Sequence, residues 1–149
     1  MFRDGSARLL VFRVGSERFA VELVLVDEVI DTPSVQPIPD APEGVHGVAT
    51  FRGELVTIYD PRVVLHVEGR VDGTALLFAR NGRRVALLVD DVYDATTIAE
   101  EEVLRPPGGA SSAADGILVG LIRRDGELIA LLDADALLDA VAAGDGERT

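Results

Sequence analysis

An internal duplication is the feature that most limits what this chain can fold into. Segments 9–22 and 75–88 align without a gap, and each reads as an apolar strand, a polar turn and a second apolar strand, which is the pattern of a β-hairpin. Further matched segments follow in the same order. The matched pairs are 9–22 with 75–88, 26–31 with 89–94, Gly47 with Gly120, and 53–65 with 126–138. The sequence therefore predicts two pseudo-repeat halves, at about residues 8–65 and 74–138.

Both halves are predicted to be mainly β. The predicted strands are short and rich in Val, Leu, Ile and Phe, as buried strands are. They are 8–14, 18–22, 47–51 and 54–59 in the first half, and 75–80, 84–89, 117–123 and 127–132 in the second. Short, evenly spaced strands indicate barrels or a sandwich. Two small barrels, made of one half each or with strands exchanged between the halves, would need a shared core because each is too small alone.

Helical pattern is limited to two places. Residues 133–143 predict a short C-terminal helix with Asp133 as its N-cap. Residues 21–30 have room for one short helical turn. The end of the chain, residues 142–149, is expected to be a flexible tail.

Two loops stand out between the predicted strands. Segment 32–44 carries four prolines, so it is expected to be extended and to lie outside the centre of a sheet. Segment 105–116 is rich in Pro, Gly, Ser and Ala. Either loop could bind a partner, and a plain connector is the preferred interpretation of the second.

Composition restricts the class of protein. The net charge is −12 and all 14 basic residues are arginines, so the electrostatic field disfavours nucleic acid as a partner. Arg80, Arg83 and Arg84 cluster around a predicted turn and are interpreted as solvated hairpin charges. The start lacks the apolar core of a signal peptide, and no apolar run approaches the roughly 18 residues of a membrane span. We therefore expect a single cytoplasmic domain without direct membrane insertion.

The sequence contains few residues that could form a catalytic site. The absence of cysteine excludes disulfides, thiolate nucleophiles and cysteine-ligated metals. The two histidines, His46 and His66, are too few for a zinc site, and the serines have no adjacent base. We therefore expect no catalytic residue, no metal and no cofactor.

The predicted turn at Arg52-Gly53 departs from ordinary hairpin chemistry. Its counterpart in the second half is Asp125-Gly126, a common pair at hairpin tips. Arginine has no such advantage in a turn, but it is a long, planar and permanently charged donor. Two interpretations stay open, a contact with a partner or a local ion pair with an acidic residue such as Glu54 or Asp60.

The run from residue 20 to residue 62 resembles the chemotaxis coupling proteins, the CheW-like family. The matching motifs are "VDEV" at 26–29, "GVATFRG" at 47–53 and "DPR" at 60–62. The similarity extends over about residues 8–141. It departs from the family pattern at Thr50, Phe51 and Pro61, where asparagine, leucine and leucine are usual.

This resemblance implies a single domain of two small SH3-like five-stranded β-barrels sharing a core. It also implies a non-catalytic adaptor that couples the cytoplasmic tip of a chemoreceptor to the regulatory domain of a histidine kinase in chemotaxis signal transduction, at membrane-associated receptor arrays. The groove between the barrels would receive the receptor, and apolar barrel surfaces would receive the kinase. The positions that match the receptor side of the family are Val26, Glu28, Gly47, Arg52 and Gly53.

Two other functions remain open at this point. One is an adaptor of the same fold in another pathway, such as motility or development. The other is a small-ligand-binding β-barrel, which would need a cluster of polar residues that the sequence does not display.

Overall fold

The fold was determined as a computed structural model, which describes residues 1–31, 33–69, 73–105 and 116–146. The elements of the described residues are, in chain order, β1 (Ser6–Val14), β2 (Glu17–Glu22), the 3₁₀ turn η1 (Leu23–Leu25), β3 (Val26–Asp31), β4 (Val45–Phe51), β5 (Glu54–Tyr59), α1 (Arg62–Leu65), β6 (Thr74–Arg80), β7 (Arg83–Val89), β8 (Asp91–Ala99), the 3₁₀ turn η2 (Glu100–Glu102), β9 (Leu118–Arg124), β10 (Glu127–Leu132) and α2 (Ala134–Gly146). The prediction of a mainly β fold with a short C-terminal helix is confirmed.

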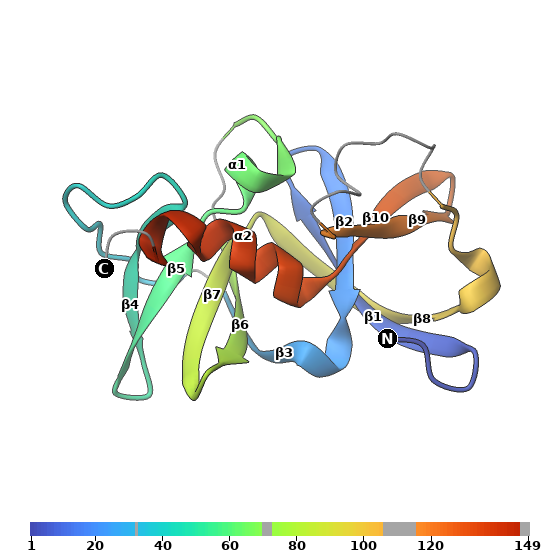
Figure 1. The fold of residues 1–149 in the computed structure, drawn as a ribbon, viewed down its shortest axis with the longest axis horizontal. Helices are drawn as coiled ribbons and strands as arrows, with labels where there is room; N and C mark the ends of the chain where they lie inside the picture. Colours follow the sequence, from blue (N-terminus) through green and yellow to red (C-terminus); the bar gives the residue numbers. More distant parts are fainter. Residues whose placement is uncertain (32, 70–72, 106–115, 147–149) are drawn as a thin grey trace.

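The strands form two five-stranded sheets that exchange strands between the two halves of the sequence. The β1 sheet has the order β8-β1-β2-β10-β9, and the β6 sheet has the order β3-β6-β7-β5-β4. Each sheet thus combines one hairpin from one half with three strands from the other. Figure 1 shows the two sheets side by side, with α2 running from the end of β10 across β7 and β5. The exchanged arrangement is therefore the observed one.

The expected barrels are not fully closed. Among the described residues, the ladders end at β8 and β9 in one sheet and at β3 and β4 in the other. The edge strands β3 and β8 both carry a register shift, between Val26 and Glu28 and opposite Leu10 and Phe12. Bulges of this kind increase twist, so each sheet curls in the manner of an SH3-like barrel without completing the ring.

One hydrophobic core spans both sheets and the C-terminal helix. It contains Phe12 and Phe19, whose rings are 5.9 Å apart, together with Phe78, Leu87 and Leu137. The opposite face of β1 is buried too, in a smaller cluster within its own sheet. Burial on both faces explains why β1 reads as a continuous apolar run rather than as an alternating one.

The eight predicted strands are all present, with ends shifted by at most two residues. Two strands were missed, β3 and β8. Both lie at the edge of their sheet and carry exposed acidic residues, such as Asp27 and Asp91, which protect an edge but weaken the apolar signal. The predicted helical turn in 21–30 is η1, and the rest of that segment is strand.

An aspartate at matched positions of the repeat precedes each helix. The Asp133 carboxylate accepts a 3.0 Å hydrogen bond from the Ala136 N–H, so the predicted N-cap of α2 is confirmed. The Asp60 carboxylate likewise accepts from the Arg62 N–H at 2.9 Å, at the start of the one-turn helix α1. Helix α2 continues to Gly146, inside the segment expected as a tail, and 147–149 lie outside the described residues.

The two loops can be placed in part. Residue Gln36 forms an isolated bridge with Val48 at the edge of β4, so the proline-rich segment runs along the sheet rather than within it. The predicted connector at 105–116 lies mostly outside the described residues. No helix in the described part of the chain is long and apolar enough to cross a membrane.

Candidate functional site

The candidate site is the hairpin end between β4 and β5, residues 50–55, which we call the first tip. Its two turn residues both have positive φ, 51° at Arg52 and 78° at Gly53, as a two-residue type I′ turn requires. The glycine adopts this conformation without strain, and a substituent there would meet open space. The arginine does not, because an L-residue in the left-handed region brings its Cβ close to the backbone.

The side chain of Arg52 is exposed and loosely held. Its Nη2 lies 3.5 Å from Oε2 of Glu28, which is longer than an ordinary N–H···O hydrogen bond. Its guanidinium carbon lies 4.8 Å from the centre of the Phe51 ring, at cation–π distance. The side chain remains 66% exposed. It can therefore reach a partner without first leaving a buried position.

The ion pair of Arg52 is not one of those expected from the sequence. Asp60 is occupied by Arg62, whose Nε and Nη2 lie 2.9 and 2.7 Å from the same carboxylate oxygen. The hydrogen bond that Arg62 donates to Asp60 raises the pKa of Arg62. Glu54 lies nearer to Arg84. The partner is Glu28, a residue that the family resemblance placed on the receptor side for a separate reason.

A second arginine supports the first tip from the neighbouring strand. Arg84, at the start of β7, places its Nε 2.6 Å from Oδ2 of Asp27 and its Nη1 3.9 Å from Oε1 of Glu54. The hydrogen bond that Arg84 donates to Asp27 raises the pKa of Arg84. Its guanidinium carbon lies 5.5 Å from the centre of the Phe51 ring. Two guanidinium groups therefore lie over one aromatic ring, among three carboxylates.

The curl of the β6 sheet brings this cluster together. Strands β3 and β4 are at opposite ends of the sheet order, yet Glu28 of β3 contacts Arg52 at the tip that β4 and β5 form. The hairpin ends of β4–β5 and β6–β7 lie along the same edge of the molecule (Figure 1). The contact between distant strands is thus a product of the fold and not of local sequence.

The other residues predicted for the receptor side lie farther from the tip. Val26 is half-buried at the start of β3, opposite Phe78. Gly47 is buried in β4, where a Cβ would lie 2.5 Å from the Gln36 carbonyl oxygen. A packing requirement therefore accounts for glycine at this position. The structure brings Glu28, Arg52 and Gly53 into one exposed group, with Val26 on the same strand as Glu28.

An open groove lies beside the first tip. It has a volume of about 700 Å³ and runs between the proline-rich segment at 33–37 and strands β4 and β5. Apolar side chains such as Val35, Phe51 and Ile58 contribute to its lining, and Leu55 at its edge is 69% exposed. Exposed apolar area next to a charged anchor is typical of a protein-binding surface.

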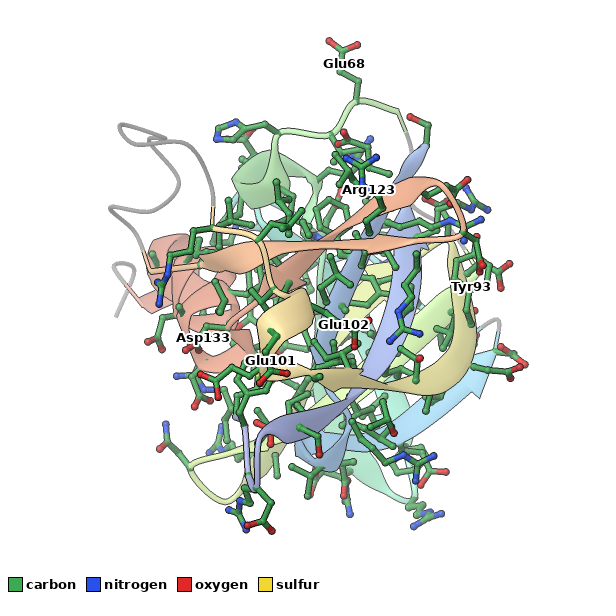
Figure 2. The ribbon with its side chains drawn as sticks, turned by 90° about the vertical axis from the view of Figure 1, so that its right-hand side faces the viewer. Glu68, Tyr93, Glu101, Glu102, Arg123 and Asp133 are labelled. Carbon is green, nitrogen blue, oxygen red and sulfur yellow. The ribbon has the colours of Figure 1, made fainter. Side chains whose placement is uncertain are left out.

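The equivalent hairpin end in the other sheet, residues 123–128, is the second tip. Asp125 and Gly126 repeat the two positive φ values, 52° and 78°. One of its two arginines, Arg124, makes contacts within the fold: it donates to the Thr97 carbonyl oxygen at 2.9 Å and lies 3.2 Å from Glu102. Figure 2 views this sheet, with Glu102 labelled in η2.

The second tip also has a counterpart of Arg84. This is Arg18 of β2, which lies 2.7 Å from Glu127 and 4.6 Å from the centre of the Tyr93 ring. Figure 2 labels Tyr93 on β8. The pairs Arg18–Glu127 and Arg84–Glu54 occupy matched positions of the repeat. That match was the sequence signal that could have identified Arg84, whereas nothing local to Phe51 indicated its two ring contacts.

The site has no arrangement suited to a metal ion. Within the described ranges, no three His, Cys, Asp or Glu side chains come together as a potential metal site. Both His46 and His66 are exposed.

Comparisons with known proteins agree with this architecture. A model of the CheW-like domain matches residues 8–142. The chemotaxis protein CheW of Rhizobium meliloti (strain 1021) is 30% identical over 137 residues, covering 90% of this chain and 88% of the relative. Protein FrzA of Myxococcus xanthus is 33% identical over 132 residues, covering 85% and 82%.

A solved structure has the same fold. The crystal structure of the scaffolding protein TtCheW from Thermoanaerobacter tengcongensis superposes with a TM-score of 0.73 over 85% of this chain and 88% of that one, at 21% identity. Because the family model covers nearly the whole described fold, this chain belongs to the CheW-like family.

Proposed function

We propose that this protein is a non-catalytic adaptor that couples a chemoreceptor to a histidine kinase in chemotaxis-type signalling. The observation that carries the proposal is Arg52, an exposed arginine held at a turn position that disfavours it and paired with Glu28. Backbone strain that the fold does not need points to a role outside the fold. Membership of the CheW-like family and the relatives named chemotaxis protein CheW support the pathway.

The receptor side is the exposed group around the first tip. Arg52 and Glu28 are the proposed charged anchors, with Gly53 open beside them and Val26 on the strand of Glu28. Gly47 acts indirectly, because it allows the segment around Gln36 to pack against β4. A few anchors within a larger apolar contact are what protein interfaces generally use. The partner is the cytoplasmic tip of the receptor, so the protein works in the cytoplasm at receptor arrays.

An adaptor also needs a second surface. An apolar groove of about 600 Å³ lies on the β1 sheet beside α1, and its lining includes Phe19, Leu65 and Leu132. Leu128 at this groove is 51% exposed. We assign this groove to the regulatory domain of the kinase. Coupling then arises because each partner changes the contacts available to the other.

The test compares how substitutions at the two tips change the affinity for a receptor fragment. Calorimetric titration would use a soluble fragment that spans the helical-hairpin tip of a chemoreceptor from the same genome. Arg52→Ala should weaken binding by roughly tenfold or more, the effect of a modest anchor, while Asp125→Ala should leave it unchanged. Arg52→Lys should restore it only in part, because lysine lacks the planar fork. Unaltered affinity of the folded Arg52→Ala protein would contradict the proposal.

The second surface is tested with variants that are expected to weaken binding of only one of the two partners. Leu128→Asp should weaken binding of the isolated kinase regulatory domain and leave binding of the receptor fragment intact. Arg52→Ala should do the reverse. If Leu128→Asp binds the kinase domain normally, the assignment of this groove is wrong.

A further inference from the structure

We propose that Phe51 and Arg84 are positioning residues that hold the guanidinium of Arg52 in the orientation in which it meets its partner. The inference rests on the proposed function, because it gives Arg52 the role of anchor. It concerns a feature of this chain, since Phe51 is an aromatic residue immediately before the exposed arginine.

The contact with Glu28 does not fix Arg52 by itself. The distance of 3.5 Å and the exposure of both side chains describe a weak, solvent-screened pair. An arginine side chain has several rotatable bonds, and an interface gains affinity when such a side chain is ordered before binding. The face of the Phe51 ring, 4.8 Å from the guanidinium carbon, supplies a second and differently directed contact. Together the two contacts limit the positions open to the guanidinium.

Arg84 fixes the ring on which Arg52 rests. It is bound at 2.6 Å by Asp27 and lies near Glu54, so its own position is well determined. Its guanidinium carbon is 5.5 Å from the same ring centre. Because Arg84 and Arg52 carry the same charge, Arg84 also disfavours any placement of Arg52 over the β7 side of the tip. The remaining placement is the observed one, toward Glu28.

The second tip shows that the support and the anchor are separable. Arg18 rests on Tyr93 and pairs with Glu127, as Arg84 rests on Phe51 and pairs with Glu54. At the second tip the aromatic ring comes from β8, and the turn residue is Asp125. In the first tip the ring is instead the neighbour of the turn arginine, which places it under that arginine.

The first measurement needs no partner. The Nε–Hε signal of Arg52 in the NMR spectrum of the folded protein should carry a ring-current shift. Phe51→Leu, which keeps an apolar side chain of similar size, should remove that shift. Arg84→Gln should change it, and Tyr93→Leu should leave it unchanged. A signal of Arg52 that is the same in all of these variants would overturn the inference. If Phe51→Leu does not fold, the Arg52 signal in Arg84→Gln alone tests the inference, and an unchanged signal would overturn it.

The second measurement is a double-mutant cycle on affinity for the receptor-tip fragment. Phe51→Leu should weaken binding about two- to fivefold when Arg52 is present, the range of one exposed cation–π contact, and should have almost no effect in Arg52→Ala. Equal effects in both backgrounds would mean that Phe51 contacts the partner itself, which contradicts the positioning role. If Arg52→Ala alone binds normally, the proposed function fails, and the NMR result still decides whether Phe51 positions Arg52.

Discussion

The two hairpin tips have the same backbone conformation, but their side chains make different contacts. Both turns combine an L-residue near φ 51° with a glycine at φ 78°. In the second tip the L-residue is Asp125, one of the residue types that tolerate this region, and the neighbouring Arg124 binds within the fold. In the first tip Phe51 stands at the position of Arg124 and packs, and the exposed turn position carries an arginine instead of an aspartate.

This difference separates what the fold requires from what function adds. The ladder between the strands and the glycine determine the turn, and they do so equally well around an aspartate or an arginine. A left-handed L-residue costs roughly 1–2 kcal/mol, and aspartate relieves part of it by hydrogen bonding locally. The first tip therefore retains a residue that its conformation disfavours. We attribute that choice to binding.

The largest expected effect comes from the buried glycines of the two hairpins. Gly47→Ala should destabilise the protein by about 2–3 kcal/mol, because the new Cβ would lie 2.5 Å from the backbone oxygen of Gln36. Gly120→Ala should cost less, since the new Cβ would lie 2.9 Å from the nearest backbone atom, the Leu104 carbonyl oxygen, and its 2.5 Å contact is with the side-chain Cγ1 of Val103. Urea unfolding of both variants measures the difference. Similar losses of stability in the two variants, or no loss, would contradict this difference in packing around the two glycines.

A smaller difference is expected at the aspartates that follow the hairpins. Asp60→Ala should lower the free energy of unfolding by about 2–3 kcal/mol, because it removes the acceptor of the Arg62 N–H and leaves the Arg62 guanidinium without its carboxylate. Asp133→Ala removes a cap alone and should cost about 1 kcal/mol. Thermal and urea unfolding of the two variants test this ranking, which equal values would contradict.

The pH dependence of that difference follows from the arginine. Pairing with Asp60 raises the pKa of Arg62 above its ordinary value. A group whose pKa is raised in the folded state makes its full contribution to stability below its ordinary pKa. It loses that contribution only as the pH rises through the pKa of the folded state. Since arginine stays charged until about pH 12 or above, the gap between the two variants should be constant from about pH 7 to pH 10. A gap that narrows in this range would exclude the Arg62 pair as its cause.

The smallest expected effect is on the stability of the turns themselves. Arg52→Asn should raise the free energy of unfolding by up to about 1 kcal/mol, and Asp125→Arg should lower it by a similar amount. Chemical denaturation of the two single variants gives both values. A loss of stability in Arg52→Asn would instead show that the contacts of Arg52 stabilise the fold.

The sequence predicted the parts of the fold that depend on local pattern. Apolar runs located eight strands, and Asp133 marked the start of α2. The acidic edge strands β3 and β8 were missed because their pairing, rather than their composition, makes them strands. The exchange of strands between halves stayed undecided, since an apolar pattern marks a strand as buried but does not specify its neighbour in the sheet.

Without the family resemblance, the candidate site was predictable only where one residue departed from the repeat. Arg52 was visible because its counterpart is Asp125. Its pairing with Glu28 was not, because that contact depends on how far the β6 sheet curls. The ring contact of Arg84 with Phe51 was not visible either, although the match of Arg84 with Arg18 in the repeat could have identified the residue itself. Long-range contacts of this kind leave no local trace in the chain.

We attribute the unfavourable arginine of the first tip to its role in binding a partner. The most direct test is the affinity of Arg52→Asn for the receptor-tip fragment, measured by calorimetry on protein whose unfolding shows it to be at least as stable as the original. We expect a dissociation constant raised by roughly tenfold or more, the loss of one anchor. An unchanged dissociation constant in this well-folded variant would contradict it.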